Sequence, residues 1–148
     1  MTQKIEKTNI VKKMFTQEGM VFSKEEGWKT LVEHINVHNQ NLSNELGFNV
    51  SWDDALFSWY ENIFTPLHRA AASRSVKKAF PELASGDLYL AVSDHWFYLK
   101  EKNEEIFPEQ AVADFAYINK NGLFKTISEL FKGSLAVKEV GIYKKRAA

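Results

Sequence analysis

The sequence predicts a single all-α domain, a compact bundle of about five helices. Apolar residues, led by tryptophan and leucine, recur every three or four positions over long stretches, the period of a helix buried on one face. Serine or aspartate precedes these stretches, and glycine or proline interrupts or ends them, as at helix boundaries. The length of 148 residues suffices for one hydrophobic core, whereas two independent domains would be unusual.

The first clear helix spans about residues 24–46. Ser23 stands where an N-cap is expected, and Glu26 three positions later completes a capping box. Gly47 can adopt the left-handed conformation that ends many helices. The apolar residues at helical spacing are Trp28, Leu31, Val32, Ile35, Leu42 and Leu46.

A second helix follows from Ser51, a further N-cap, and runs to about Ala72 with acidic residues in its first turn. Pro66 lies well inside this pattern. Because proline lacks a backbone N–H, we expect it to kink or divide the helix near residues 62–65.

Three further helices are expected in the second half of the chain. One opens at Asp87 and continues to about residue 103, and the next begins with Pro108 at its first position. Gly122 ends or bends that helix, and residues 123–131 form a last amphipathic helix.

The two ends of the chain are less regular. Residues 1–22 form an N-terminal arm, 23–133 the helical domain and 134–148 a C-terminal tail. The segment NIVKKMF in the arm fits either a short strand or a helical turn. Paired with LAVKEVGIY in the tail, it would form a small terminal β-ribbon.

The overall composition bounds the function. Lysine and arginine balance aspartate and glutamate, so no net charge attracts nucleic acid or anionic lipid. No cysteine is present, which excludes disulfides, thiolate metal ligands and a cysteine nucleophile. No segment resembles a signal peptide or a membrane span, so we expect a cytoplasmic protein with no membrane contact.

Three blocks of sequence resemble a bacterial helical domain of unknown function. In that family the domain follows a ParB-like nuclease module in putative transcriptional regulators, and a related version accompanies a lipopolysaccharide-kinase-like module. The blocks are LVEHINVHNQNL, VSWDDALFSWYENIFTPL and FPELASGDLYLAVSDHWFYL, the last followed by PEQAVADF. The resemblance implies a compact helical domain and no activity. Residues 1–22 are too few for the ParB-like module, and Glu82-Leu83-Ala84 replaces the family's Gly-Arg-Thr.

Histidines and carboxylates supply the candidates for metal binding and catalysis. His34 and His38 lie four positions apart on one helix, so with His95 and Glu61 they form a candidate metal site. His95 beside Asp94 is a candidate general base. Ser58 and Ser93 qualify as nucleophiles by residue type alone. The alternative for all of these residues is a structural role within the bundle.

Two other groups can contact a partner. The basic residues Arg69, Arg74, Lys77 and Lys78, together with Lys144, Lys145 and Arg146, are candidates for binding nucleic acid or another anion. Trp59, Tyr60 and Asn62 can form a stacking surface, although the spacing of Trp59 places it in the core.

These observations favour a non-catalytic interaction or regulatory module in a bacterial cytoplasm, which self-associates or docks to a protein partner. We expect no cofactor and no enzymatic activity. One alternative is a metal-dependent enzyme or metalloprotein that uses His34, His38 and His95. A second is a nucleic-acid-associated regulator.

Overall fold

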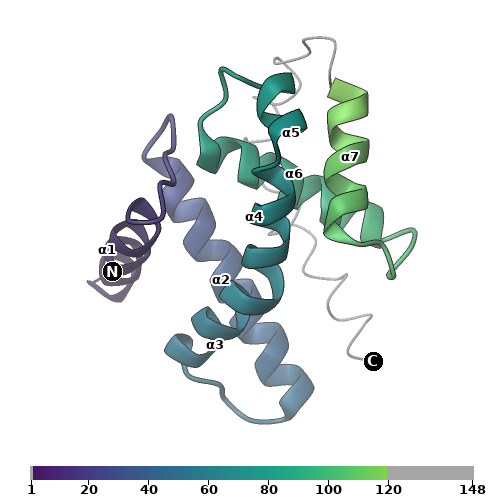
Figure 1. Cartoon of the computed structure of the whole chain (residues 1–148). Coiled ribbons are helices and arrows are strands. Elements are labelled where there is room, and N and C mark those ends of the chain that lie inside the picture. Colours follow the sequence, from purple (N-terminus) through teal and green to yellow (C-terminus); the bar gives the residue numbers. More distant parts are fainter. Residues whose placement is uncertain (1, 120–148) are drawn as a thin grey trace.

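The computed structural model describes residues 2–119, and every regular secondary-structure element in this range is a helix, so the predicted all-α class is confirmed (Figure 1). The elements in order are α1 (Thr2–Thr16), α2 (Glu26–Leu46), α3 (Trp52–Trp59), the π-helical turn η1 (Tyr60–Phe64), α4 (Thr65–Ala71), α5 (Arg74–Ala79), α6 (Ser85–Lys100) and α7 (Pro108–Asn119). None of the helices within residues 2–119 has the length and apolarity needed to cross a membrane.

Helix α6 is the centre of the bundle. Twelve of its sixteen residues are buried, and it packs against α2, α4 and α7. Figure 1 shows α2 on one side of α4 and α7 on the other, with α6 behind them. A helix covered on nearly all sides needs apolar residues around most of its circumference, which the sequence from Leu88 to Phe97 provides.

A cluster of four aromatic rings joins α1, α3, η1 and α6. Phe15 packs edge-on against Trp59 and Phe64, with ring centroids 5.9 Å and 4.7 Å away. Tyr89 of α6 lies 6.2 Å from Trp59 and 5.0 Å from Phe64. All four side chains are almost fully buried, so this cluster supplies a large share of the apolar contact in the core.

The expected interruption before Pro66 takes the form of the π-helical turn η1. The Thr65 N–H donates to the Tyr60 carbonyl, five residues back, and Pro66 lies in the first turn of α4. A π-helical turn inserts one extra residue into the helix, so the backbone adjusts to the absence of an N–H donor at Pro66. The chain changes direction between α3 and α4 (Figure 1).

Several helix boundaries follow the predicted caps. The Ser51 hydroxyl accepts from the Asp54 N–H at 3.1 Å, and α3 begins at the next residue. Gly47, with a φ of 77°, ends α2, and its N–H donates to the Ser43 carbonyl. Pro108 opens α7.

The predicted cap at Ser23 is wrong. Helix α2 begins at Glu26, and no side chain caps it. The backbone N–H of Ser23 instead points to the carboxylate of Asp87, at 3.3 Å and 3.4 Å from its two oxygens. Residue 23 is therefore held against the first turn of α6, and the helix begins only after the chain has left that contact.

The N-terminal segment forms a helix of fifteen residues, so of the two alternatives for NIVKKMF the helical one is correct. Val11 and Phe15 of α1 are fully buried, which makes α1 part of the core. Residues 9–15 are helical, so they do not form a strand of a terminal ribbon. The other segment of that ribbon and the expected helix 123–131 lie outside the described residues.

Candidate functional site

The four candidate metal ligands are not gathered at one place. His34, His38, His95 and Glu61 belong to α2, α6 and η1. Within residues 2–119 no group of three or more histidine, aspartate or glutamate side chains is arranged to hold a metal ion. Each of the three histidines instead has surroundings of its own.

His34 is a buried residue of the α2 core face. Its side chain is 5% exposed, and burial lowers its pKa to about 4, because the protonated imidazole would lose its hydration. The ring is therefore neutral near pH 7 and is enclosed by the bundle. Neither property suits a side chain that must reach a substrate.

His38 joins α2 to α3. Its Nε2 lies 3.0 Å from the hydroxyl of Ser58, and partial burial lowers its pKa. The Asn62 amide donates to the Ser58 carbonyl at 2.9 Å. A serine beside a histidine is the first half of a hydrolytic triad, but no carboxylate of the described residues orients the second nitrogen of His38. The arrangement fits a helix-to-helix contact.

His95 joins α6 to α7. Its Nε2 lies 2.7 Å from a carboxylate oxygen of Asp114, a residue that the sequence did not single out. Asp94, the expected partner, is 1% exposed and lies on a different side of α6 from His95, which is half-buried. Ser93 is completely buried, so its hydroxyl has no access to a substrate.

The aromatic candidates also have structural positions. Trp59 is 2% exposed, within the core cluster. Tyr60 is half-buried and donates its hydroxyl hydrogen to Glu18, and this hydrogen bond and burial raise its pKa. Tyr60 is thus an amphipathic residue at the edge of the core, as its sequence position indicates.

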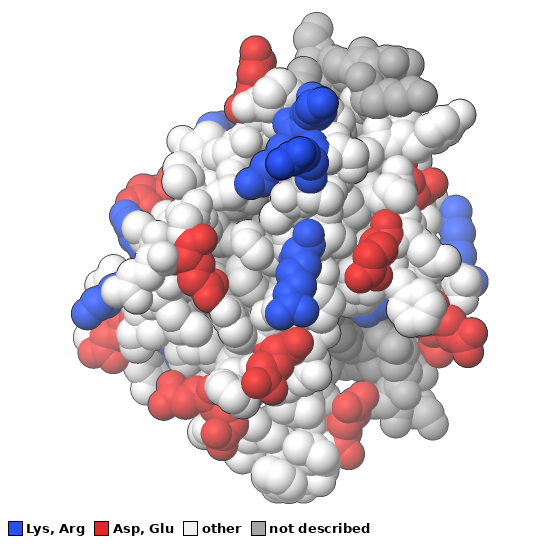
Figure 2. Space-filling view, viewed as in Figure 1, with Lys and Arg blue, Asp and Glu red and all other residues white. Residues whose placement is uncertain are grey.

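The basic candidates Arg69, Arg74, Lys77 and Lys78 are all exposed on α4 and α5. Figure 2 shows one group of basic side chains over α5, a further basic side chain in the middle of the face between acidic ones, and others at its edges. A nucleic-acid surface normally presents a continuous basic stripe. On this face acidic side chains separate the basic ones instead (Figure 2).

Large apolar side chains are exposed where α2 connects to α3. Leu46, Phe48 and Phe57 are 53%, 62% and 64% exposed. This end of the molecule is the lower end in Figure 1, and in Figure 2 it shows uncharged atoms bordered by acidic side chains. The helical spacing placed Leu46 on the apolar face of its helix, whereas the structure leaves it exposed. Phe48 and Phe57 were not singled out, because periodicity identifies buried faces and does not locate apolar residues outside them.

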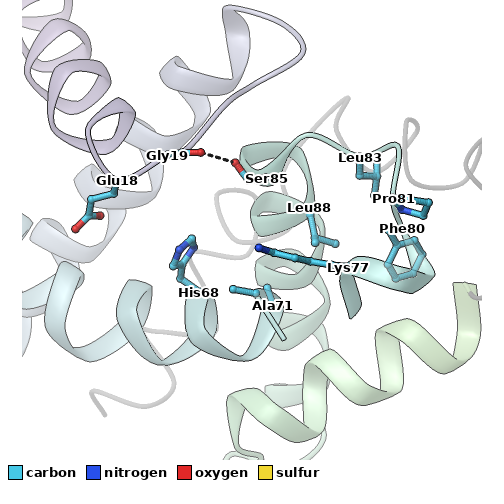
Figure 3. Close-up of a pocket in the computed structure, with 11 residues that line it drawn as sticks. Glu18, Gly19, His68, Ala71, Lys77, Phe80, Pro81, Leu83, Ser85 and Leu88 are labelled. Carbon is cyan, nitrogen blue, oxygen red and sulfur yellow. Dashed lines mark hydrogen bonds between the residues drawn. The ribbon is translucent and has the colours of Figure 1, made fainter. Parts of the chain in front are cut away.

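A cavity of about 300 Å³ lies where the end of α1 meets α4, α5 and α6. Three of its lining residues, Glu18, His68 and Lys77, have ionisable side chains (Figure 3). Of the three, only Lys77 is a candidate from the sequence, since residues 18, 68 and 77 share no local motif and converge only through the fold.

Comparison of the chain with known protein families, with characterised proteins and with solved structures finds no match.

Proposed function

We propose that this protein is a non-catalytic interaction module that docks to a protein partner through the α2–α3 end, defined by Leu46, Phe48 and Phe57. The exposure of these three side chains is the observation that carries the proposal. Aromatic and aliphatic side chains on the surface lose solvent contact when a partner covers them, and phenylalanine supplies much of the apolar area of protein interfaces.

The charges around this end indicate the chemistry of the partner. Residues 30–68 contain five acidic residues and no lysine or arginine. Four of the five, Glu45, Asp53, Asp54 and Glu61, are exposed within the α2–η1 segment. Lys7 of α1 lies over the Trp52 ring at the start of α3, 5.3 Å from its centroid, so the four exposed carboxylates outnumber this one basic neighbour. A partner with a basic segment that carries apolar residues complements this surface in both charge and hydrophobicity.

The polar candidates support a non-catalytic role because each has a structural task. His38 with Ser58 connects α2 to α3, and His95 with Asp114 connects α6 to α7. The resemblance to a helical domain that accompanies ParB-like and kinase-like modules agrees with a regulatory role in a bacterial cytoplasm.

The test is affinity capture from source-cell lysate with the natural protein and with the double variant Phe48→Ser/Phe57→Ser. Both residues are exposed, so the variant should retain the helical fold. We expect one protein that is enriched by the natural chain and lost with the double variant, and whose binding weakens as salt is raised.

Ile5→Ser/Ile10→Ser is the matched control, because Ile5 and Ile10 are exposed apolar residues of α1. Retained capture by this control, with loss in the α2–α3 variant, supports the proposal. Equal capture by all three proteins contradicts it. If the captured species is a second copy of the chain, the protein self-associates and does not bind a basic partner. Sizing of the purified chain at micromolar concentration distinguishes a dimer from a monomer and so separates the two cases.

A further inference from the structure

The cavity between α1, α4, α5 and α6 combines an apolar wall with a positive charge. Ala71, Phe80, Pro81, Leu83 and Leu88 supply the wall. Figure 3 shows the Lys77 side chain reaching along this wall, with its nitrogen directed towards His68. The volume of about 300 Å³ is at the lower end of the range for ligand pockets, so a ligand must be small.

Among residues 2–119, Lys77 forms no ion pair with an acidic side chain. The ion pairs among residues 2–119 join Lys4 to Glu33, Lys12 to Glu25 and His95 to Asp114, and none involves Lys77. The Lys77 side chain is exposed, and it is the anion held against the apolar wall that would be partly shielded from water, so it would interact with the ammonium group more strongly than in open water. Lys77 is thus available for an anionic ligand.

His68 of α4 faces the end of the Lys77 side chain (Figure 3). Its ring is stacked on Phe64, with centroids 4.9 Å apart and planes at 14°, which fixes its orientation. Partial burial lowers the pKa of His68, the negative charge of Glu18 raises it and the positive charge of Lys77 lowers it. The imidazole can therefore donate a hydrogen bond to an anion that lies between it and Lys77.

Glu18 does not occupy the place of that anion. Its carboxylate accepts a hydrogen bond from Tyr60, and Figure 3 shows it directed away from Lys77. The Ser85 hydroxyl is also engaged, since it accepts from the Val21 N–H at 2.9 Å and donates to the Gly19 carbonyl at 3.3 Å. Lys77 and His68 are therefore the polar groups that remain to bind a ligand.

We propose that this cavity binds a small organic anion with an apolar body, such as a short aliphatic or aromatic carboxylate. The carboxylate lies between Lys77 and His68, and the apolar body lies against Phe80, Leu83 and Leu88. This binding site is separate from the α2–α3 end, so the proposal of anion binding does not depend on the proposed docking to a protein partner.

The experiment compares three probes of matched shape by NMR titration: 4-phenylbutyrate, 4-phenylbutanol and 4-phenylbutylamine. We expect the carboxylate to bind at least ten times more tightly than the amine and to raise the pKa at which the His68 ring titrates. Lys77→Gln should weaken carboxylate binding about tenfold and leave binding of the alcohol unchanged.

Lys78→Gln is the matched control, because Lys78 is the adjacent exposed lysine of α5 and does not line the cavity. It should bind the carboxylate as the natural protein does. Equal binding of the three probes, tightest binding of the amine, an equal effect of the two lysine variants, or no shift at cavity residues with millimolar probe would each overturn the proposal.

Discussion

At the scale of single residues, the histidines that suggest chemistry in the sequence are parts of the packing. His34 shows this most clearly, because its folded-state pKa of about 4 lies below the usual value of 6.5. Between these two pH values the unfolded chain binds a proton at this position and the folded chain does not. The free energy of unfolding is therefore highest above pH 6.5 and falls as the pH decreases towards 4.

We predict that the contribution of His34 to stability, roughly 3 kcal/mol for a pKa shift of this size, is lost between about pH 6.5 and pH 4. His38 and His68 act in the same direction, since burial lowers the pKa of both. Urea unfolding at pH 7 and pH 4.5 measures the difference. The His34→Gln variant should show a shallower pH dependence, and an unchanged slope would show that His34 is not the source.

A second prediction at this scale concerns Ser58. Because His38 contacts Ser58 without a carboxylate of the described residues to orient it, we expect a fluorophosphonate that labels activated serines to leave Ser58 unmodified. Mass spectrometry of the treated protein provides the measurement. Labelling at Ser58 that disappears in His38→Gln would instead support the enzymatic alternative.

At the scale of elements, the contact of α2 with α6 depends on two glycines around one aromatic ring. A Cβ atom at Gly27 would lie 2.2 Å from Phe22, and one at Gly86 would lie 2.6 Å from it. Phe22 also packs edge-on against Trp28 at 4.7 Å. The ring is therefore enclosed by the backbones of two helices and cannot remain in place beside a larger residue.

We predict that Gly27→Ala and Gly86→Ala each lower the free energy of unfolding by about 1–3 kcal/mol, the usual cost of overpacking. An unconstrained glycine inside a helix would show the opposite sign, because alanine is the better helix former. Thermal or urea unfolding measures the effect. In a Phe22→Ala background the penalty should disappear, and its persistence there would rule out the Phe22 contact as the cause.

The two serine N-caps of α3 and α5 form a matched pair for a second test. The Ser51 side chain accepts from a backbone N–H in the first turn of α3, whereas Ser73, at the N-cap of α5, makes no capping hydrogen bond. Ser51→Ala should cost about 1 kcal/mol and Ser73→Ala less than half of that. The changes in the free energy of unfolding of the two variants, measured under the same conditions, test this difference between the caps. Equal changes would contradict the prediction.

The sequence predicts a helix boundary correctly where residues next to that boundary determine it. Ser51, Gly47 and Pro108 mark helix ends through their own backbones and side chains, and Pro66 marks an interruption because it lacks an N–H. Ser23 does not cap α2: its backbone N–H points to the carboxylate of Asp87, 64 positions away, and the helix begins only at Glu26. The contact of His95 with Asp114 and the convergence of Glu18, His68 and Lys77 also arise from tertiary packing, which spacing along the chain does not show.

At the scale of the whole molecule, a net charge of zero conceals an uneven distribution. The α2–η1 segment is acidic and carries exposed apolar side chains, whereas basic side chains gather over α5 (Figure 2). An even mixture of charges would give weak, unspecific attraction to other molecules. Separated charges favour one orientation of a charged partner and make its association dependent on ionic strength.

The most direct measurement of the docking surface is hydrogen–deuterium exchange of the chain, alone and with its captured partner. We predict that added protection is concentrated in the peptides that span residues 44–61, with little change in α5. Protection confined to α5 and the start of α6, or no added protection within residues 44–61 despite stable binding, would contradict the central claim that the protein acts through its acidic, apolar α2–α3 end.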